Sequence, residues 1–470
     1  MSETRRLLKN TGIIAVGGMA TKLVQFLLLP LYTTVLTTAE YGTVDYVNTI
    51  ALFLVPAVSL LMDEALFRFL IDCCDDKDRK RVVTSSCVVL GSGCCAFAVL
   101  MLAVWFAFQP GNLAWVVALV VSQCLLTMSS AVMRGFGDTV SFTVMNLLAG
   151  IATIVMNILF IAVFHWGVVG MLSAAVIAQA CAALIFMARK KIWRYICLNA
   201  FDSGEAKDMV RYSLPLIPNK VSWTIMNMLD RLIIMNTIGS AASGVYAVSY
   251  KFPSVMDQIY GFFYQSWKES SARALCEDDA DAFYNSVYRA LRRFMMSVVL
   301  GMTALMPLVY GILIKGSFDE GILYVPILLL ATYFSNMSGF YGGVFTAHKD
   351  TGIMGTTTVV SAMLCIVLCL VLIPLFGLYG ASVATIAATF TVNEYRRIKV
   401  AKYVRLHGDK RELILTVLAV AVTFALFYVH AYTDNLFALV GCLCVAVSFF
   451  VGMNLSLIKK AVGFVVARRG

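Results

Sequence analysis

Charged side chains stand inside stretches of this chain that are otherwise apolar enough to cross a membrane. Four of them are cations: Lys22, Lys220, Arg231 and Lys251. A Lys at the depth expected for Lys22 costs about 2.5 to 3.5 kcal/mol on insertion scales, so such a side chain should face a bundle interior or an aqueous cavity. Lys and Arg are also the side chains that bind phosphate. We therefore predict a polar path in which these four cations bind an anionic headgroup.

Acidic side chains accompany the cations and are candidates for coupling or gating: Asp45, Asp63, Glu64, Asp230 and Asp257. The alternative is structural, with the ions neutralising one another across helices, Lys22 with Asp63 and Arg231 or Lys251 with Asp257. None of these pairs has an i,i+4 spacing, so the sequence alone does not establish them. For Asp63 and Glu64 the alternative to a gate is a helix-end cluster with Arg68.

The elements that must position these residues are membrane helices. Hydrophobic residues make up 60% of the 470 residues and charged residues 14%, whereas soluble domains have about half and a quarter. We predict an all-α polytopic membrane protein with about 14 transmembrane helices. They lie near 11–36, 42–66, 83–108, 113–133, 142–164, 167–188, 212–238, 242–267, 294–314, 322–346, 354–375, 377–395, 412–432 and 435–458.

Most of the 37 Lys and Arg residues fall in alternate loops between these spans. Such residues collect on the cytoplasmic side, which predicts that both termini are cytoplasmic. The net charge of +10 is explained by this bias and by anionic lipid, so no nucleic-acid partner is expected.

An internal repeat organises the chain. Asp138-Thr139 precedes an apolar run that ends in Trp166-Gly167-Val168-Val169-Gly170, and Asp350-Thr351 precedes a similar run that ends in Phe376-Gly377-Leu378-Tyr379-Gly380. An even number of spans per repeat gives both copies the same orientation. We expect two pseudo-symmetric six-helix lobes, 1–190 and 212–400, joined by a cytoplasmic linker at 191–211.

Two further segments lie outside the repeat. Residues 279–293 are predicted to form an amphipathic helix on the inner face, with its Arg residues toward lipid headgroups. Residues 401–470 comprise a basic cytoplasmic segment and the last two spans, which have no counterpart in either lobe and offer either packing or a groove for a lipid tail.

Nothing in the sequence indicates an enzyme. Gly91-Ser92-Gly93 lies in a span without the Lys of a P-loop, and the 13 Cys residues match no zinc spacing. The four His residues lie at loops or span ends. We expect no catalytic site, no metal and no cofactor.

Several motifs resemble the opening of a known family. Asn10-Thr11-Gly12, Lys22, Pro30-Leu31-Tyr32 and Glu40-Tyr41-Gly42 are similar to the first helices of bacterial polysaccharide flippases. These belong to the multidrug/oligosaccharidyl-lipid/polysaccharide exporter superfamily. The start of the seventh span also resembles the second lobe of that family, through the residues Tyr212, Pro215, Pro218, Trp223 and Asp230-Arg231 followed by Leu232-Ile233-Ile234.

The resemblance covers roughly residues 1–400 and implies a flippase in the cytoplasmic membrane of a bacterium. Its substrate would be an undecaprenyl-diphosphate-linked oligosaccharide, moved by alternating access for surface polysaccharide assembly. The implied partners are membrane lipid, a coupling proton or sodium ion, and a polysaccharide polymerase. The alternatives are a lipid II flippase and a cation-coupled multidrug exporter. The exporter would usually have twelve spans and an acid deep in the first span, where this chain has Lys22.

Overall fold

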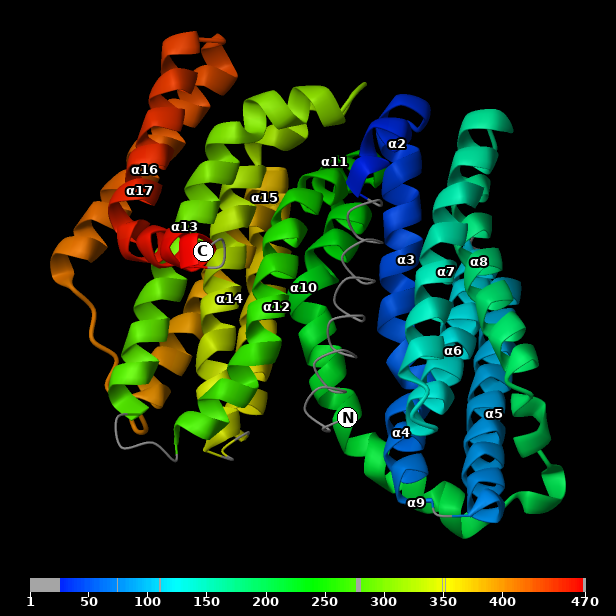
Figure 1. The fold of residues 1–470 in the computed structure, drawn as a ribbon. Helices are drawn as coiled ribbons and strands as arrows, with labels where there is room; N and C mark the ends of the chain where they lie inside the picture. Colours follow the sequence, from blue (N-terminus) through cyan, green and yellow to red (C-terminus); the bar gives the residue numbers. More distant parts are fainter. Residues whose placement is uncertain are drawn as a thin grey trace. The chain divides into compact units, whose positions relative to one another are not determined.

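The computed structural model describes residues 26–73, 75–109, 111–275, 280–348, 350 and 352–467. These residues are helical almost throughout and contain no strand, so the all-α prediction is confirmed (Figure 1). The chain divides into two compact units, Met1–Gly244 and Val245–Gly470. The predicted domain limits at 190, 211 and 400 stay a prediction.

The first unit contains α2 (Leu29–Val35), α3 (Thr38–Ser59), α4 (Met62–Asp72), α5 (Asp76–Phe108), α6 (Leu113–Gly135), α7 (Thr139–Asn157), α8 (Gly167–Arg189), α9 (Ser203–Ser213) and α10 (Ile217–Thr237). Short turns are the π-helix η1 (Ile158–Val163) and the 3-10 helices η2 (Ile192–Tyr195), η3 (Leu198–Ala200) and η4 (Leu214–Leu216). Helix α11 (Ser240–Ser249) crosses the boundary. The second unit contains α12 (Lys251–Ala274), α13 (Ala280–Leu313), η5 (Asp319–Leu323), α14 (Val325–Ala347), α15 (Gly352–Val400), α16 (Lys410–Thr433) and α17 (Leu436–Ala467).

Within the described residues, nine helices are long and apolar enough to cross a membrane. They account for ten of the fourteen predicted spans, because α15 contains two of them. Most of the predicted span 11–36 lies outside the described residues, while α10, the pair α11 and α12, and α14 fall outside the nine. The protein is a multi-pass membrane protein, and the number fourteen stays a prediction.

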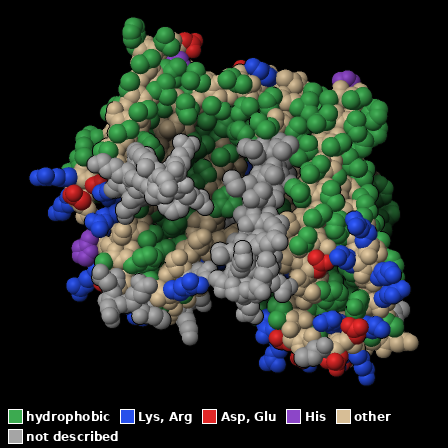
Figure 2. All heavy atoms as spheres, viewed as in Figure 1, with side chains coloured by type: hydrophobic (Ala, Val, Ile, Leu, Met, Phe, Trp, Pro, Cys, Tyr) green, Lys and Arg blue, Asp and Glu red, His purple; other side chains and the backbone are tan. Residues whose placement is uncertain are grey.

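Helix α6 is the central helix of the first unit. Its most apolar window is 61% buried, against 6% for α5. Met128 and Val132 of α6 pack with Met62 and Leu66 of α4 in one core cluster. Few side chains in the apolar window of α5 are buried, and Figure 2 shows a largely hydrophobic surface over the upper part of this unit. Exposed apolar side chains of this kind are what a helix in contact with lipid requires.

The predicted second span, 42–66, is broken. Helix α3 ends at Ser59, and the next two residues, Leu60 and Leu61, have left-handed backbone angles with φ of 51° and 49°. Ser59 Oγ accepts a hydrogen bond of 3.2 Å from the Leu61 backbone nitrogen. The break places Asp63 and Glu64 in the first turn of α4, where the positive end of the helix dipole favours carboxylates.

The two copies of the sequence repeat form hairpins with the same corner. The first glycine of each copy has a positive φ, 53° at Gly167 and 59° at Gly377. This region is accessible to glycine without a steric penalty. The second glycine allows close packing, because a Cβ would lie 3.1 Å from Phe160 Cβ at Gly170 and 2.0 Å from the Leu372 oxygen at Gly380. The repeated G-x-x-G spacing therefore encodes one structural corner used twice.

The aspartate that opens each hairpin also bonds to the segment that follows the hairpin. In the first copy Asp138 caps α7 through Ser141 N and pairs with Lys190 at 2.6 Å. In the second copy Asp350 accepts a hydrogen bond from the Tyr403 hydroxyl. Burial would raise the pKa of Asp138, but its bonds from Lys190 and Ser141 outweigh this and hold the pKa below its ordinary value.

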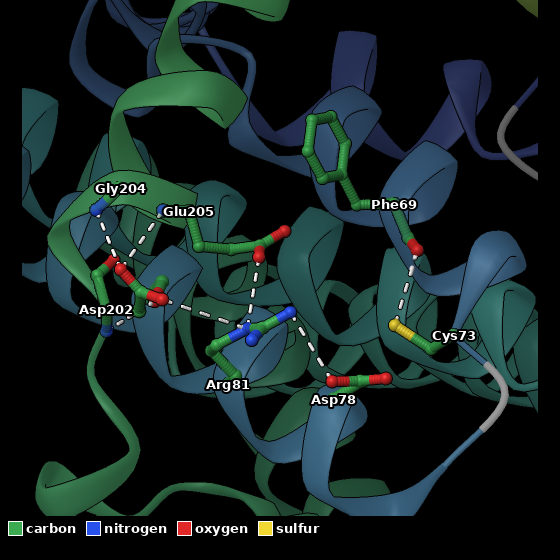
Figure 3. Close-up of polar contacts among 8 residues, drawn as sticks. Phe69, Cys73, Asp78, Arg81, Asp202, Gly204 and Glu205 are labelled. Carbon is green, nitrogen blue, oxygen red and sulfur yellow. Dashed lines mark hydrogen bonds and ion pairs between the residues drawn. The ribbon is translucent and has the colours of Figure 1, made fainter.

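The predicted linker is held against the start of α5. Thr84 Oγ1 donates to the Tyr195 oxygen at 2.9 Å and accepts from Cys197 N at 3.0 Å. Figure 3 shows Arg81 of α5 directed at the acidic groups that begin α9, with Glu205 at 3.1 Å. The Asp202 side chain caps α9 by accepting from Gly204 N at 2.8 Å. The segment between α8 and α10 thus has fixed partners in the first unit.

The predicted interfacial helix at 279–293 is wrong as a separate element. Residues 280–313 form the single helix α13, without a break at 293. Arg292 and Arg293 do not point to lipid headgroups but bind Glu412 of α16, at 2.5 and 2.7 Å. The periodicity of the sequence identified the amphipathic character of residues 279–293. It did not identify Glu412 as the partner of the two arginines, because Glu412 is distant in sequence. This charge cluster joins α16 to α13 within the second unit.

We expect Glu412→Gln to lower the free energy of unfolding by about 3 kcal/mol, since it removes the buried carboxylate that neutralises Arg292 and Arg293, whose side chains are 14% and 32% exposed. Thermal unfolding of the purified protein in detergent measures the effect. Glu394→Gln is the matched control, because its partner Arg397 is 54% exposed and such surface pairs contribute at most about 1 kcal/mol. Equal losses in both variants would contradict the assignment.

Candidate substrate-binding site

A buried ion pair joins α3 to α10 in the first unit. Arg231 Nη1 lies 2.9 Å from Asp45 Oδ1 and 3.3 Å from Asp45 Oδ2, and each side chain is 11% exposed. Asp230, also buried, accepts a hydrogen bond from the Arg231 backbone nitrogen at 2.9 Å. Sequence spacing offered Asp257 as the partner of Arg231, and the contact with Asp45 was missed. The Arg231 guanidinium is thus bound to the Asp45 carboxylate.

The Glu40-Tyr41-Gly42 motif forms the start of α3, and Asp45 follows it on the same helix. Glu40 and Thr37 form a reciprocal capping box, with Thr37 N donating to Glu40 Oε2 at 2.8 Å. Tyr41 is buried beside the pair. At Gly42 a Cβ would lie 1.9 Å from the Ser240 oxygen of α11, and at Gly244 a Cβ would lie 1.9 Å from the Thr38 oxygen. Backbones of α3 and α11 therefore meet directly, one turn before Asp45.

A chain of polar aromatic groups continues from this point. The rings of Tyr32 and Tyr41 lie 6.3 Å apart, and the Tyr32 hydroxyl accepts a hydrogen bond from the Asn157 amide at 2.9 Å. Tyr32 and Tyr41 belong to motifs seen in the sequence, but their role near the ion pair was not predicted, and Asn157 was missed. The signal for Asn157 was a polar residue inside an apolar run.

The remaining candidates of the first unit either lie apart from this ion pair or fall outside the described residues. Lys22 falls outside the described residues, so its predicted contact with Asp63 stays a prediction. Lys220 is an exposed residue of α10 and interacts electrostatically with Asp63 of α4. Glu64 is exposed on the same first turn. The structure thus brings Asp45, Asp230 and Arg231 together and places Lys220 near Asp63.

Two candidates belong to the second unit. Lys251 is the first residue of α12, and Asp257 follows on the same helix. Both side chains are half-buried. Tyr250, between α11 and α12, has helical backbone angles, with φ of −71° and ψ of −13°. Hydrogen bonds from Tyr250 N to the Tyr246 oxygen and from Ser254 N to the Tyr250 oxygen continue across it, so Lys251 lies where the two helices join.

Arg396 is a buried cation one residue beyond the predicted span 377–395. It is 8% exposed and lies on the second half of α15. In the described part of the chain its guanidinium hydrogen bonds all end on neutral oxygens. These are Thr357 Oγ1 at 3.0 Å, the Ser338 oxygen at 3.1 Å, Thr358 Oγ1 at 2.9 Å and the Met354 oxygen at 3.3 Å. They tie α14 to both halves of α15.

We expect Asp45→Asn to lower the free energy of unfolding by about 3–5 kcal/mol, because it removes the negative charge that lies 2.9 Å from the buried Arg231 guanidinium. The double variant Asp45→Asn with Arg231→Gln should recover most of this loss, as a double-mutant cycle detects. Arg68 and Asp72, an exposed pair at 2.6 Å, supply the matched control cycle. Additive losses at Asp45 and Arg231 would show that the contact carries no coupling.

Gly42→Ala should lower the free energy of unfolding by about 1–3 kcal/mol, because the added methyl group forces α3 and α11 apart. The control is Gly91→Ala, where a Cβ meets nothing within 4 Å and alanine favours the helix. Thermal unfolding of both proteins makes the comparison. A Gly42→Ala protein as stable as the control would rule out the backbone contact.

The chain resembles known proteins in sequence and in fold. The sequence model of the family described as polysaccharide biosynthesis protein matches residues 7–267. No curated protein sequence matches the chain.

Solved structures share the fold at low identity. An inward-facing multidrug resistance MATE family transporter of the MOP superfamily has a TM-score of 0.66 and 14% identity, over 83% of this chain and 98% of that chain. The lipid II flippase MurJ in an inward closed conformation has a TM-score of 0.67 and 13% identity, over 96% and 99%. A MOP superfamily transporter from Pyrococcus furiosus has a TM-score of 0.50 at 14% identity.

Fold and helix composition define a multi-pass membrane protein with the architecture of the MOP-superfamily transporters. Since the family model matches more than half of its length, the chain belongs to the polysaccharide biosynthesis protein family. The resemblance noted in the sequence is thereby confirmed. The matched range includes the buried pair of Asp45 and Arg231.

Proposed function

We propose that this protein is a flippase for an undecaprenyl-diphosphate-linked oligosaccharide, moved from the inner to the outer leaflet of a bacterial cytoplasmic membrane by alternating access. The observation that carries the proposal is the buried Arg231, held by Asp45 inside the range that matches the polysaccharide family. A guanidinium at membrane depth is costly, and retaining it suits a protein that must bind an anion there.

Arg231 would bind the diphosphate by exchanging partners. Phosphate oxygens accept two parallel hydrogen bonds from a guanidinium, as a carboxylate does, so the diphosphate can take the place of Asp45. Asp45, released from the cation, would then take up a proton or bind a sodium ion. Substrate arrival and ion binding would in this way be linked at one contact, 2.9 Å long in the present structure.

The other candidates would extend this binding surface. Lys22, Lys220 and Lys251 are proposed to bind the diphosphate or acidic sugars. Asp63, Glu64, Asp230 and Asp257 are proposed to take part in coupling or gating, and the break at Leu60 and Leu61 supports movement of α4 with its two carboxylates.

A groove between α16 and α17 suits the lipid part of the substrate. Its volume is about 520 Å³. Its walls are largely apolar and are formed by Leu415, Ala419, Cys444, Val445, Ser448, Phe449, Gly452 and Met453. Because these two helices have no counterpart in the repeat, a separate task for them is expected. We propose that the groove accepts part of an isoprenoid tail.

Lipid II transport is the second candidate function. It is favoured by the fold, since the MurJ structure covers 96% of this chain, whereas the polysaccharide assignment is favoured by the family match. Both substrates are lipid-linked and anionic. A polysaccharide polymerase and a coupling ion are the partners proposed for the first function, and both termini are proposed to be cytoplasmic.

We expect deletion of the gene to cause lipid-linked oligosaccharide to accumulate on the cytoplasmic side. Restoring the gene with Arg231→Ala or Lys22→Ala should not clear it, because the diphosphate loses a cation. Extraction and chromatography of the lipid-linked intermediates measure the accumulation, with expression verified for each variant. Arg68→Ala, which removes an exposed guanidinium from the same unit, is the control and should restore clearance.

Three results would contradict the proposal. Normal clearance by well-expressed Arg231→Ala would exclude a role of that cation. Accumulation of lipid II instead would favour the second candidate. If no intermediate accumulates while sensitivity to cationic drugs rises, the protein is a multidrug exporter.

A further inference from the structure

A second apolar groove lies in the first unit, apart from the ion pair and from the α16–α17 groove. Its volume is about 300 Å³, at the lower end of the usual range for ligand pockets, about 300–1,000 Å³. Its thirteen lining residues carry no charged group. Leu90, Gly91 and Cys94 of α5 form one wall, and Cys124 and Met128 of α6 form another.

The groove lies on a lipid-facing surface. Helix α5, which forms its first wall, is the least buried of the candidate membrane helices at 6%. Gly91 is exposed, and a Cβ built there meets nothing within 4 Å. The absence of a side chain at this position therefore opens the wall toward the acyl chains of the bilayer.

One end of the groove is closed by the turn η2. Ile192 of this turn and Ile196, which follows it, line the groove, while Trp193 between them is 53% exposed. The turn is held in place by the hydrogen bonds of Thr84 to Tyr195 and Cys197. Its position is thus fixed before any ligand binds. An exposed Trp on such a turn is typical of the membrane–water interface.

Positive charge gathers at the same end. Lys191 is the residue before the turn and Arg194 lies within it, and both side chains are exposed. Neither forms an ion pair with another residue of the described ranges, whereas the neighbouring Lys190 is bound to Asp138. An apolar groove with basic side chains at its interfacial end has the form of an anionic phospholipid site, since basic pockets between membrane helices bind such headgroups.

We propose that this groove binds one acyl chain of an anionic bilayer phospholipid, whose phosphate lies against Lys191 and Arg194. The site holds a resident lipid of the membrane. The volume accommodates part of a single chain and is smaller than the groove assigned to the substrate tail. The bound lipid would fasten the linker turn to α5 and α6.

The test uses the full-length protein in nanodiscs of phosphatidylcholine with a trace of phosphatidylglycerol that carries a photoreactive group on one acyl chain. After illumination and digestion, mass spectrometry should find the label on peptides from 87–94 or 121–132. Excess phosphatidylglycerol should compete for the label, and excess phosphatidylcholine should not.

Two variants separate the two halves of the site. Gly91→Phe fills the groove and should lower the labelling at least about fivefold, and Gly311→Phe, also at a glycine with open space, should leave it unchanged. Lys191→Ala with Arg194→Ala should lower the labelling about five- to thirtyfold. Because these two side chains are exposed, this variant keeps the test valid even if Gly91→Phe does not fold.

Three outcomes would overturn the proposal. Equal competition by phosphatidylcholine would show that no anionic headgroup is recognised. Competition by an isoprenyl diphosphate alone would make the groove part of the substrate path. Labelling that is unchanged by both variants would place the lipid elsewhere. None of these outcomes depends on transport, so the proposed flippase activity is tested separately.

Discussion

The contact between Asp45 and Arg231 is the interaction on which the first unit depends. Its two side chains come from helices α3 and α10, and both are nearly inaccessible. Taking two charges out of water is unfavourable, so the pair persists only if its partners are held in good geometry. The capping box of Thr37 and Glu40 fixes the start of α3, and the glycine contact with α11 fixes its distance from the neighbouring backbone. The residues around the start of α3 therefore serve to hold the buried ion pair of Asp45 and Arg231 in place.

Much of the fold could be predicted because a membrane helix is recognised from a continuous run of apolar residues. Apolar runs of the required length located ten spans that the structure shows as long apolar helices. The repeated glycine spacing predicted a recurrent hairpin, and its corner appears in both copies. Breaks were harder to predict. Nothing in Leu60 and Leu61 as residue types indicates a left-handed backbone, which leucine adopts only where tertiary contacts impose it.

The candidate site was less predictable because charge pairing depends on contacts between distant residues. Apolar surroundings singled out Arg231 and Asp45 in the sequence, and the structure shows both side chains only 11% exposed, but spacing along one helix gives no information about a partner on another. The same limit explains the two arginines that bind Glu412. Arg396 was missed for a different reason, since a basic residue at a span end fits a cytoplasmic loop equally well.

The neutral surroundings of Arg396 have a consequence for the response of the protein to membrane voltage. An ion pair that moves as a unit transfers no net charge, so the membrane potential does no work on the pair of Asp45 and Arg231 while it stays closed. Arg396 is bound by neutral oxygens and carries its full charge with it. Any motion that shifts it by a tenth of the membrane field changes its energy by about 0.2 kcal/mol at 100 mV. The energy of any movement of α15 that carries Arg396 through the membrane field would therefore depend on voltage.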